Sequence, residues 1–334
     1  MTGSSDRSAT MTALRRALPY IRLYRDKTFV VKIGGGPCAD PAALARLAEE
    51  VGVLRAFGVR VVIVHGGGPQ TTDLSAKLGL QTVFLEGRRV TDQATLDVAI
   101  MTISGTVNTA VLAALRAADV PAIGISGVDA GFVRARKRPA RVKVDGDKRT
   151  TFDYGLVGDV VAVDKTPALK LLEAGFTPVV SPLSADDSGQ VLNLNADVVA
   201  AAIARELGAE KLVFMTDAPG LLEDKNDPST LVSYTDVRGL NALTERGLVD
   251  AGMLPKLNAV KEALYGGVKR VHLVSAHARD ALLAEIFTNE GAGTLIVADM
   301  KELMPAEVVL PTHVERILSA GAHDGGRSTA AEPR

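Results

Sequence analysis

The chain has 334 residues, of which 47% are hydrophobic and 23% are charged, so it can bury a large core as one big or two moderate domains. Its 38 basic and 39 acidic residues nearly cancel at a net charge of −1, which gives no global field for nucleic acid or a membrane surface. The absence of Trp and the 4% aromatic content also argue against a base-stacking nucleic-acid platform.

The sequence favours a soluble protein of a reducing, cytoplasmic compartment, with no membrane partner. Cys38 is the single cysteine, so no intramolecular disulfide can form. No apolar run approaches the roughly 20 residues that a membrane span requires. The N-terminus lacks the pattern of a secretory signal, although its arginines at 7, 15, 16, 22 and 25 leave an organellar transit peptide as an alternative.

The first 25 residues predict a disordered start followed by a short helix. Residues 1–10 are polar and typical of disorder. From Met11 to Ile21 apolar residues recur at helical spacing with arginines between them, which predicts an amphipathic helix. Pro19 is expected to interrupt it.

The next segment alternates strands and helices and predicts a parallel sheet with right-handed crossovers. β-branched apolar runs predict buried strands at 28–33 and 60–64, with a helix at 41–57 between them. The further elements expected in this half are a helix near 92–118 broken by Gly105, a strand at 121–125 and a strand at 177–181.

Residues 131–163 have a different character. They are β-rich and basic, so we expect hairpins inserted on the edge of the sheet, with a turn at Gly146. Polar turn residues at 185–192 then mark the boundary to a second α/β half. Its expected elements are helices at 193–207, 255–266 and 279–288 and strands at 211–215, 269–274 and 294–298, before a frayed tail after residue 300.

Two strands each end in three glycines, at Gly34–Gly36 and at Gly66–Gly68. Glycines at a strand end remove Cβ atoms, so backbone N–H groups can close on an anion. Neither turn is a P-loop, and no G-x-G-x-x-G follows the first strand. The pair favours a phosphoryl-transfer or nucleotide enzyme that is not of the Walker or dinucleotide-binding type.

Three charged residues occupy positions that suggest a role beyond structure, because a charge there is unfavourable or can hold an opposite charge. Lys32 ends an apolar strand, which is unfavourable unless its amine meets an anion. Asp197 begins a helix and either caps it or holds lysines in place. Lys256 follows Pro255 in a first helical turn, where a cation opposes the helix dipole and indicates a compensating anion.

Arginine and histidine supply further candidates. Arg88 and Arg89 precede a helix, and arginine is suited to bidentate carboxylate binding, although a solvated loop is the alternative interpretation. His65 lies beside a glycine turn as a base or, in better keeping with its apolar strand, as a packed structural residue. The remaining histidines show no metal-ligand spacing, at 272, 277, 313 and 323.

Together and in this order, these pieces resemble the amino acid kinase family, and within it the enzymes that phosphorylate N-acetyl-L-glutamate in arginine biosynthesis. The resemblance implies an α/β fold, a three-layer αβα sandwich with a central, mostly parallel sheet and an N-terminal helix extension. It covers roughly residues 20–298. The motifs that carry it are VVKIGGG (30–36), VIVHGGGPQ (62–70), GRRVTD (87–92), RARKRP (134–139), YGLVGDV (154–160), NLNADVVAAAIA (193–204), MTDAPGLL (215–222), GMLPKL (252–257) and EIFTNEGAGTLI (285–296).

The resemblance assigns residues to three groups. As catalytic residues it implies Lys32, Lys256, Asp197, Gly35 and Gly67. For the acceptor, N-acetyl-L-glutamate, it implies Gly67, Gly68, Arg89, Asn193 and Asn195, with Arg89 on the α-carboxylate. For ATP, with Mg²⁺ carried by the nucleotide and no metal site of the protein, it implies Lys32, Gly34, Gly35, Thr216, Asp217, Gly220, Leu221 and Lys256.

The resemblance also implies a domain organisation and regulation. After the N-terminal 1–25, residues 26–190 would bind the acyl amino acid, 191–300 would bind ATP, and 301–334 would be a partly disordered extension. The helix near 12–25 is similar to that of hexameric, arginine-inhibited members, and Glu285, Glu290 and Gly293 match their effector segment. A homo-oligomer, dimer or hexamer, is therefore expected.

The sequence departs from the family pattern at several positions and leaves alternatives open. Ile33–Pro37 stands where the family usually has Tyr-Gly-Gly-Asn, and Glu86 and Arg88 flank the acceptor arginine. Other acceptors are an N-acylated aminoadipate, aspartate or carbamate, and carbamate lacks the α-carboxylate that Arg89 would grip. A catalytically silent effector-binding homologue is a different class, and an oxidoreductase is disfavoured by the missing dinucleotide fingerprint.

Overall fold

An eight-stranded sheet runs through the centre of the computed structural model, which describes residues 11, 15, 17–85, 88–145, 148–224, 226–249, 252–288 and 291–302. The strand order is β14-β16-β15-β13-β1-β2-β10-β5, and every neighbouring pair is parallel except β15 and β16. The predicted mostly parallel sheet is confirmed. Its strands are β1 (Thr28–Ile33), β2 (Arg60–His65), β5 (Ala122–Ser126), β10 (Thr177–Ser181), β13 (Lys211–Thr216), β14 (Tyr234–Asp236), β15 (Arg270–Ser275) and β16 (Thr294–Val297).

Helices cover both faces of this sheet and complete the three-layer sandwich. Apolar residues of α2, α5 and α10 share one buried cluster with Phe29 and Val31 of β1. Apolar residues of α6, α7, α8 and α9 share another with Val30 of the same strand. The helices are α2 (Pro41–Ala56), α3 (Gly68–Lys77), α4 (Gln93–Ala99), α5 (Asn108–Ala117), α6 (Thr166–Glu173), α7 (Ala196–Glu206), α8 (Val237–Glu245), α9 (Leu254–Tyr265) and α10 (Ala281–Phe287).

Side chains of a strand alternate between the two faces, and this decides where the charged residues point. On β1, Val30 faces the α7 side while Val31 faces the α2 side, so Lys32 points to α7. On β2, Val62 and Val64 face α7, so His65 points to the opposite layer. The strand pattern thus separates Lys32 from His65 although both end neighbouring strands.

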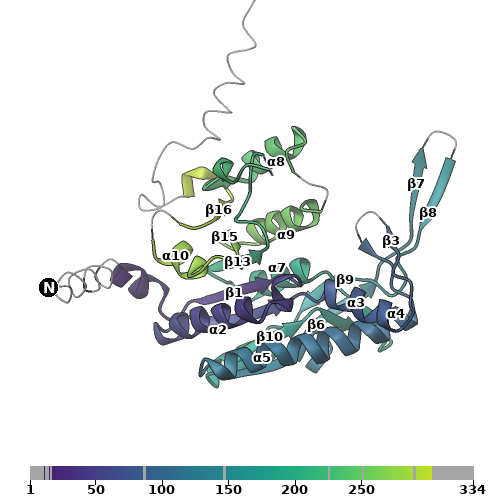
Figure 1. Ribbon diagram of the computed structural model, residues 1–334, viewed down its shortest axis with the longest axis horizontal. Helices are drawn as coiled ribbons and strands as arrows, with labels where there is room; N and C mark the ends of the chain where they lie inside the picture. Colours follow the sequence, from purple (N-terminus) through teal and green to yellow (C-terminus); the bar gives the residue numbers. More distant parts are fainter. Residues whose placement is uncertain are drawn as a thin grey trace, which may run out of the picture.

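The segment 131–163 forms hairpins, as predicted, but not on the edge of the main sheet. That edge is β5, and β6 pairs with β9 and β11 in a separate four-stranded sheet of order β12-β11-β6-β9. The hairpin β7–β8 projects from the body of the molecule (Figure 1), and Gly146 at its expected turn lies outside the described residues. The strands are β3 (Phe84–Leu85), β4 (Arg88–Arg89), β6 (Val133–Lys137), β7 (Arg141–Asp145), β8 (Lys148–Phe152), β9 (Gly158–Val163), β11 (Leu183–Ala185) and β12 (Val191–Asn193).

The helix expected near 92–118 runs without the predicted break at Gly105. Between α4 and α5 the backbone widens into a π-helical segment, Ile100–Val107, which contains this glycine. By length and composition alone the continuous helix Gln93–Ala117 is long and apolar enough to cross a membrane, contrary to the expectation from the sequence. It packs instead against α2 and the strands β5 and β10 as a core helix does.

The N-terminal helix extension is present, and Pro19 does not interrupt it. The described residues 11, 15 and 17–24 are all helical, so the helical backbone is present on both sides of Pro19. Tyr24 anchors the helix by an edge contact with Phe29, with ring centroids 5.3 Å apart. The expected disorder of 1–10 and the expected tail from 303 onward lie outside the described residues.

A buried carboxylate joins α2 to α10 and makes stability depend on pH. Glu50 Oε2 accepts a hydrogen bond from the backbone N–H of Leu283 at 3.0 Å, and burial raises the pKa of Glu50 to about 7. Because this pKa is raised in the folded state, the stabilisation is fully present below about pH 4.5 and is lost as the pH rises through 7.

We therefore expect the Glu50→Gln variant to lose a pH dependence that the parent protein shows. Between pH 4.5 and 8 the free energy of unfolding of the parent should fall by up to about 3 kcal/mol more than that of the variant. Urea unfolding at several pH values measures this difference, and Glu49→Gln, at an exposed neighbour, is the matched control. Equal pH dependence in the parent and the Glu50 variant would contradict the prediction.

Candidate active site

Lys32, Asp197 and Lys256 meet between β1, α7 and α9. Lys32 Nζ lies 2.7 Å from Asp197 Oδ1, and Lys256 Nζ lies 3.1 Å from both carboxylate oxygens of Asp197. The side chains of the two lysines are only 8% and 12% exposed. One carboxylate therefore holds two buried amines that come from distant parts of the chain.

The local sequence explains how Asp197 and Lys256 are positioned in this cluster. Asn195 caps α7, its Oδ1 accepting hydrogen bonds from the backbone N–H groups of Asp197 and Val198. Asp197 thus occupies the first turn of α7, where a negative charge is favoured by the helix dipole. Lys256 lies in the first turn of α9, with its amine over the Phe214 ring, 5.0 Å from the ring centroid. The ring face and the Asp197 carboxylate offset the unfavourable energy of a cation at the positive end of the helix dipole.

The cluster changes the ionisation of its members. Burial alone would raise the pKa of Asp197, but the charges of Lys32 and Lys256 outweigh it and hold that pKa below its usual value. Burial, together with the charge of Lys32, lowers the pKa of Lys256 to about 8, and Asp197 opposes this only in part. Asp197 is therefore ionised at neutral pH, and Lys256 loses its proton near pH 8.

The two glycine turns touch each other beside the cluster. A Cβ atom on Gly35 would lie 2.7 Å from Pro69 Cδ and 3.1 Å from the backbone nitrogens of both Gly67 and Gly68. Gly68 begins α3, so these nitrogens lie at a helix N-terminus, a natural site for an anion. Between described residues, no hydrogen bond uses the N–H of Gly35 or Gly67. The turns can therefore donate to a phosphoryl group, as the sequence predicts.

His65 holds the second glycine turn and does not act as a base. Its side chain is fully buried, and its Nδ1 donates to the backbone carbonyl of Gly66 at 2.9 Å. Its Nε2 then accepts from Asn108 Nδ2 at 3.0 Å. Burial lowers the pKa of His65 to about 4, so the ring is neutral. The structural interpretation of this histidine is confirmed.

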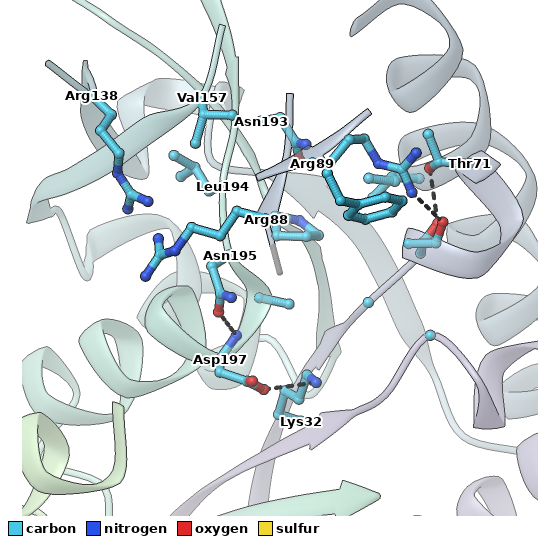
Figure 2. A pocket seen from close by; sticks show the side chains of 18 residues that line it. Lys32, Thr71, Arg88, Arg89, Arg138, Val157, Asn193, Leu194, Asn195 and Asp197 are labelled. Carbon is cyan, nitrogen blue, oxygen red and sulfur yellow. Dashed lines mark hydrogen bonds and ion pairs between the residues drawn. The ribbon is translucent and has the colours of Figure 1, made fainter. Parts of the chain in front are cut away.

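A cavity of about 280 Å³ opens above the cluster (Figure 2), close to the lower end of the range for small-molecule sites. Most of the predicted catalytic and acceptor residues line it. Lys256 is not part of the wall, but its amine contacts Asp197, which is. The predicted residues in its wall are Lys32, Gly35, Gly67, Gly68, Arg89, Asn193, Asn195 and Asp197.

Arg89 lies at the far side of the cavity from Lys32 (Figure 2). One terminal nitrogen donates to the backbone carbonyl of Gly68 at 2.8 Å and to Thr72 Oγ1 at 2.6 Å. The guanidinium also stacks on Phe84, 5.0 Å from the ring centroid. Burial lowers the pKa of Arg89, but arginine stays charged at any physiological pH. The described residues that it bonds offer neutral oxygens, so its charge is available to an anion.

The hairpin that carries Arg89 is anchored to the YGLVG segment. Gly155 has a left-handed backbone with φ +70°, and a Cβ there would lie 2.3 Å from the carbonyl oxygen of Thr91. The absence of that Cβ lets the backbone of Thr91 bond to both neighbours of Gly155, accepting from Leu156 and donating to Tyr154. Asn193 Nδ2 lies 3.4 Å from Thr91 Oγ1 and joins β12 to the same anchor.

Sequence reasoning missed several residues of the cavity. Arg138 lines it, and its guanidinium donates from Nε to Asp159 Oδ1 at 2.9 Å and from a terminal nitrogen to the same oxygen. Arg88 also lines it; the sequence offers this residue beside Arg89 as a carboxylate-binding candidate, but the family resemblance gives it no role. Phe84 under Arg89 and Phe214 under Lys256 carried no signal of their own, although strand alternation places Phe214 on the α7 face.

Lys32 and Gly35 line the cavity, whereas the other predicted nucleotide residues lie outside its wall. Thr216 ends β13, which is the neighbour of β1, and Gly34 donates its N–H to the carbonyl of Met215. Asp217 Oδ1 lies 2.9 Å from His277 Nε2. Gly220 and Leu221 pack on Thr294, whose Oγ1 accepts from the N–H of Leu221. The candidates thus follow a strand that runs parallel to the lysine strand.

The predicted effector residues form a separate buried group. Glu285 Oε2 accepts from the N–H groups of Ala292 and Gly293, and its Oε1 lies 2.7 Å from His272 Nδ1. His272 Nε2 lies 3.0 Å from Lys211 Nζ, which lies over the Tyr24 ring of the N-terminal helix. Glu290 lies outside the described residues.

These features define a class: a three-layer α/β phosphotransferase whose paired lysines and glycine turns lie at the carboxyl ends of parallel strands. The chain belongs to the amino acid kinase family, whose model matches residues 27–275.

Relatives of known name agree with this assignment. The chain is 46% identical to acetylglutamate kinase of Myxococcus xanthus over 86% of this chain and 94% of that protein. It is 41% identical to acetylglutamate kinase of Symbiobacterium thermophilum over 85% and 96% of the two chains. Among solved structures, N-acetylglutamate synthase of Neisseria gonorrhoeae, complexed with coenzyme A and N-acetyl-glutamate, matches with a TM-score of 0.75 and 30% identity. The match covers 86% of this chain and 63% of the synthase chain.

Proposed function

We propose that this chain transfers the γ-phosphoryl group of ATP to the side-chain carboxylate of N-acetyl-L-glutamate, a step of arginine biosynthesis in the cytoplasm. The single observation that carries the proposal is the pair of buried amines of Lys32 and Lys256 held by Asp197 at one end of a small cavity. The names of the relatives at 41–46% identity support the choice of acceptor.

The residues suit a reaction that needs no base. An acceptor carboxylate has a reference pKa of about 4.3, so it is ionised and nucleophilic at neutral pH. One of its oxygens attacks the γ-phosphorus, and the bond from that phosphorus to the β,γ-bridging oxygen breaks. The electron pair leaves with ADP, no proton moves, and an acyl phosphate remains. Catalysis then consists of positioning and of neutralising charge on the transferred group.

Each end of the acceptor has a matching group in the cavity. The α-carboxylate would bind Arg89, whose guanidinium bonds neutral oxygens in the described part of the chain, with the amide of Asn193 beside it. The side-chain carboxylate would then lie at the glycine turns and Lys32. The N–H groups of Gly35 and Gly67 would donate to the phosphoryl group as it transfers.

The nucleotide would approach from the carboxyl end of β13, where Thr216, Asp217, Gly220 and Leu221 follow the strand. We assign ATP to residues 191–300 and the acceptor to residues 26–190 on this basis. Mg²⁺ keeps most of its water ligands and binds through phosphate oxygens, so it would enter with ATP and neutralise charge there. Among the described residues, no three His, Cys, Asp or Glu side chains are grouped as a metal site.

Hydroxylamine, which traps acyl phosphates as hydroxamates, tests the proposal directly. Purified protein with ATP and Mg²⁺ is offered N-acetyl-L-glutamate, N-acetyl-aminoadipate, aspartate or carbamate in parallel. Hydroxamate formation should depend on N-acetyl-L-glutamate. Phosphorylation of another acid, with N-acetyl-L-glutamate inert, would replace the acceptor, and inactivity on all four would favour an effector-binding protein.

The acidity of Lys256 predicts the pH profile of the reaction. Its pKa is lowered to about 8, and the amine must be protonated to stabilise the phosphoryl group, so kcat/KM should fall as the pH rises through 8. Lys256→Arg keeps its charge at high pH, so its profile should stay flat over the same range, at a lower absolute rate. A wild-type profile that stays flat to pH 10 would show that this proton is not required.

We further propose a homo-oligomer that L-arginine inhibits through Glu285, Gly293 and Glu290. The proposal is supported by the closeness of the N-terminal helix to this group through Tyr24 and Lys211. Titrating activity against L-arginine tests inhibition, and a flat curve up to millimolar effector rejects it. Sedimentation of the purified protein tests the assembly, and a monomer would reject it.

A further inference from the structure

The acceptor cavity contains one more cation than a dicarboxylate requires. Lys32, Arg88, Arg89 and Arg138 all line it, and Asp197 is the acidic residue in its wall among described residues. The cations differ in the groups that they bond, and these partners decide which cations are free to meet a ligand.

Arg138 is neutralised by its own partner. Two nitrogens of its guanidinium donate to Asp159 Oδ1, and the side chain, 11% exposed, lies beside the Tyr154 ring. Asp159 is more exposed but remains a full charge within contact distance. The pair adds shape and hydrogen-bond donors to the cavity but little net charge.

Two positive centres match the two carboxylates of the acceptor. The lysine cluster carries two amines and one carboxylate, which leaves one net positive charge at one end. Arg89 supplies the other end, since the described groups that it bonds are the neutral oxygens of Gly68, Thr72 and Thr82. N-acetyl-L-glutamate would therefore be neutralised without any contribution from Arg88.

Arg88 is the remaining cation. It precedes Arg89 on β4, and side chains of successive strand residues point to opposite sides, so Arg88 turns away from α3 and extends past Asn195 toward the side of the cavity where Arg138 lies (Figure 2). No hydrogen bond or ion pair with another described residue holds its guanidinium. Asn195 and Asp197 begin α7, where the helix dipole adds further positive potential.

We infer that Arg88 is an additional catalytic residue of this chain, whose guanidinium binds the oxygens of the phosphoryl group in transit between ATP and the acceptor carboxylate. The inference rests on the proposed function. The phosphoryl group is the one anion that enters the cavity besides the two carboxylates. A third cation without a bonded partner among the described residues is suited to it, because charge on the equatorial oxygens must be neutralised as the bond to ADP breaks. The cavity measures only about 280 Å³, so a ligand that fills it lies close to every residue of its wall, Arg88 included.

The experiment separates binding of the acceptor from stabilisation of the reacting group. Arg88→Leu should lower kcat by about 10²-fold, the typical effect of removing one such donor, with KM and the calorimetric Kd for N-acetyl-L-glutamate changed less than about threefold. Arg88→Lys should recover part of the rate. Arg141→Leu, at an exposed arginine of β7 outside the cavity, is the matched control and should behave as the parent.

Each other outcome overturns the inference. An unchanged kcat with a raised Kd would place Arg88 on the acceptor in the ground state, and parent-like kinetics would make it a solvated side chain. Arg88→Gln, which keeps length and polarity, replaces the leucine variant if thermal melting shows that the latter does not fold. Failure of the proposed function is distinguishable, because the parent enzyme itself would then make no hydroxamate from N-acetyl-L-glutamate.

Discussion

Replacing Lys32 or Lys256 by alanine is expected to lower kcat by about 10²- to 10⁴-fold while changing KM for the acceptor far less. Both amines meet at Asp197, and Lys32 and Asp197 line the end of the cavity where the phosphoryl group would pass. Their charge should matter most when charge develops on that group, and the proposed function has the acceptor held elsewhere, by Arg89. Steady-state kinetics with each substrate varied in turn measure both parameters.

The matched control for the lysine variants is Lys77→Ala. Lys77 lies on α3 with its side chain 68% exposed, paired only with Asp73 one turn away. Its removal changes the net charge equally but should leave kcat and KM as in the parent. A variant of Lys32 or Lys256 that kept a near-normal kcat would remove that lysine from the mechanism.

A methyl group on Gly35 should be almost as damaging as the loss of a lysine. The added Cβ of Gly35→Ala would fill the point where the backbone nitrogens of Gly67 and Gly68 converge, 3.1 Å from each, and would press on Pro69 Cδ at 2.7 Å. The two glycine turns would have to separate, and the donors would leave their positions. We expect kcat/KM to fall by at least about 10²-fold, as for loss of an oxyanion donor.

Gly52→Ala is the control for the glycine substitution. Gly52 lies within α2, where the nearest atom to an added Cβ would be Val120 Cγ2 at 3.5 Å, an ordinary contact. Alanine also favours a helix over glycine by about 1 kcal/mol. This variant should be as active as the parent and melt at the same or a higher temperature. If Gly35→Ala also keeps its activity, the glycine turns do not form the phosphoryl site.

Geometry makes the two predictions independent of each other. Lysine removal acts on charge and leaves the backbone in place, whereas a Cβ on Gly35 moves backbone donors and leaves the charges in place. A pH profile separates them further. The limb near pH 8 should vanish in Lys256→Ala and persist in Gly35→Ala, because the latter still contains the titrating amine.

The sequence by itself determined the elements whose cause is local. Short apolar runs rich in β-branched or aromatic residues favour buried strands, and β1, β2, β10 and β13 were predicted within a residue or two of their observed bounds. Glycines at the ends of β1 and β2, and proline before Lys256, likewise act through their own backbone geometry. The family resemblance added the roles of Arg89, Asn193 and Asp197, and the structure places these residues in one cavity.

Where local signals conflict with tertiary packing, the predictions from the sequence were wrong. Gly105 and Pro19 are helix breakers by propensity, yet both lie in helical backbone. The strand β14 and the helix α8 are short and were not predicted at all. The hairpins of 131–163 were recognised, but their pairing with β11 depends on a strand that comes later in the chain.

Tertiary structure alone decided which side chains share the site. Whether Lys32 meets Asp197 depends on the face of the sheet that α7 covers, and whether Lys256 joins them depends on α9 packing beside α7. The entry of Arg88 and Arg138 into the cavity depends on two hairpins that lie outside the main sheet. Periodicity and propensity depend only on residues that are close in the sequence. Charge pairing depends instead on distances in space, and the order of the strands sets these distances.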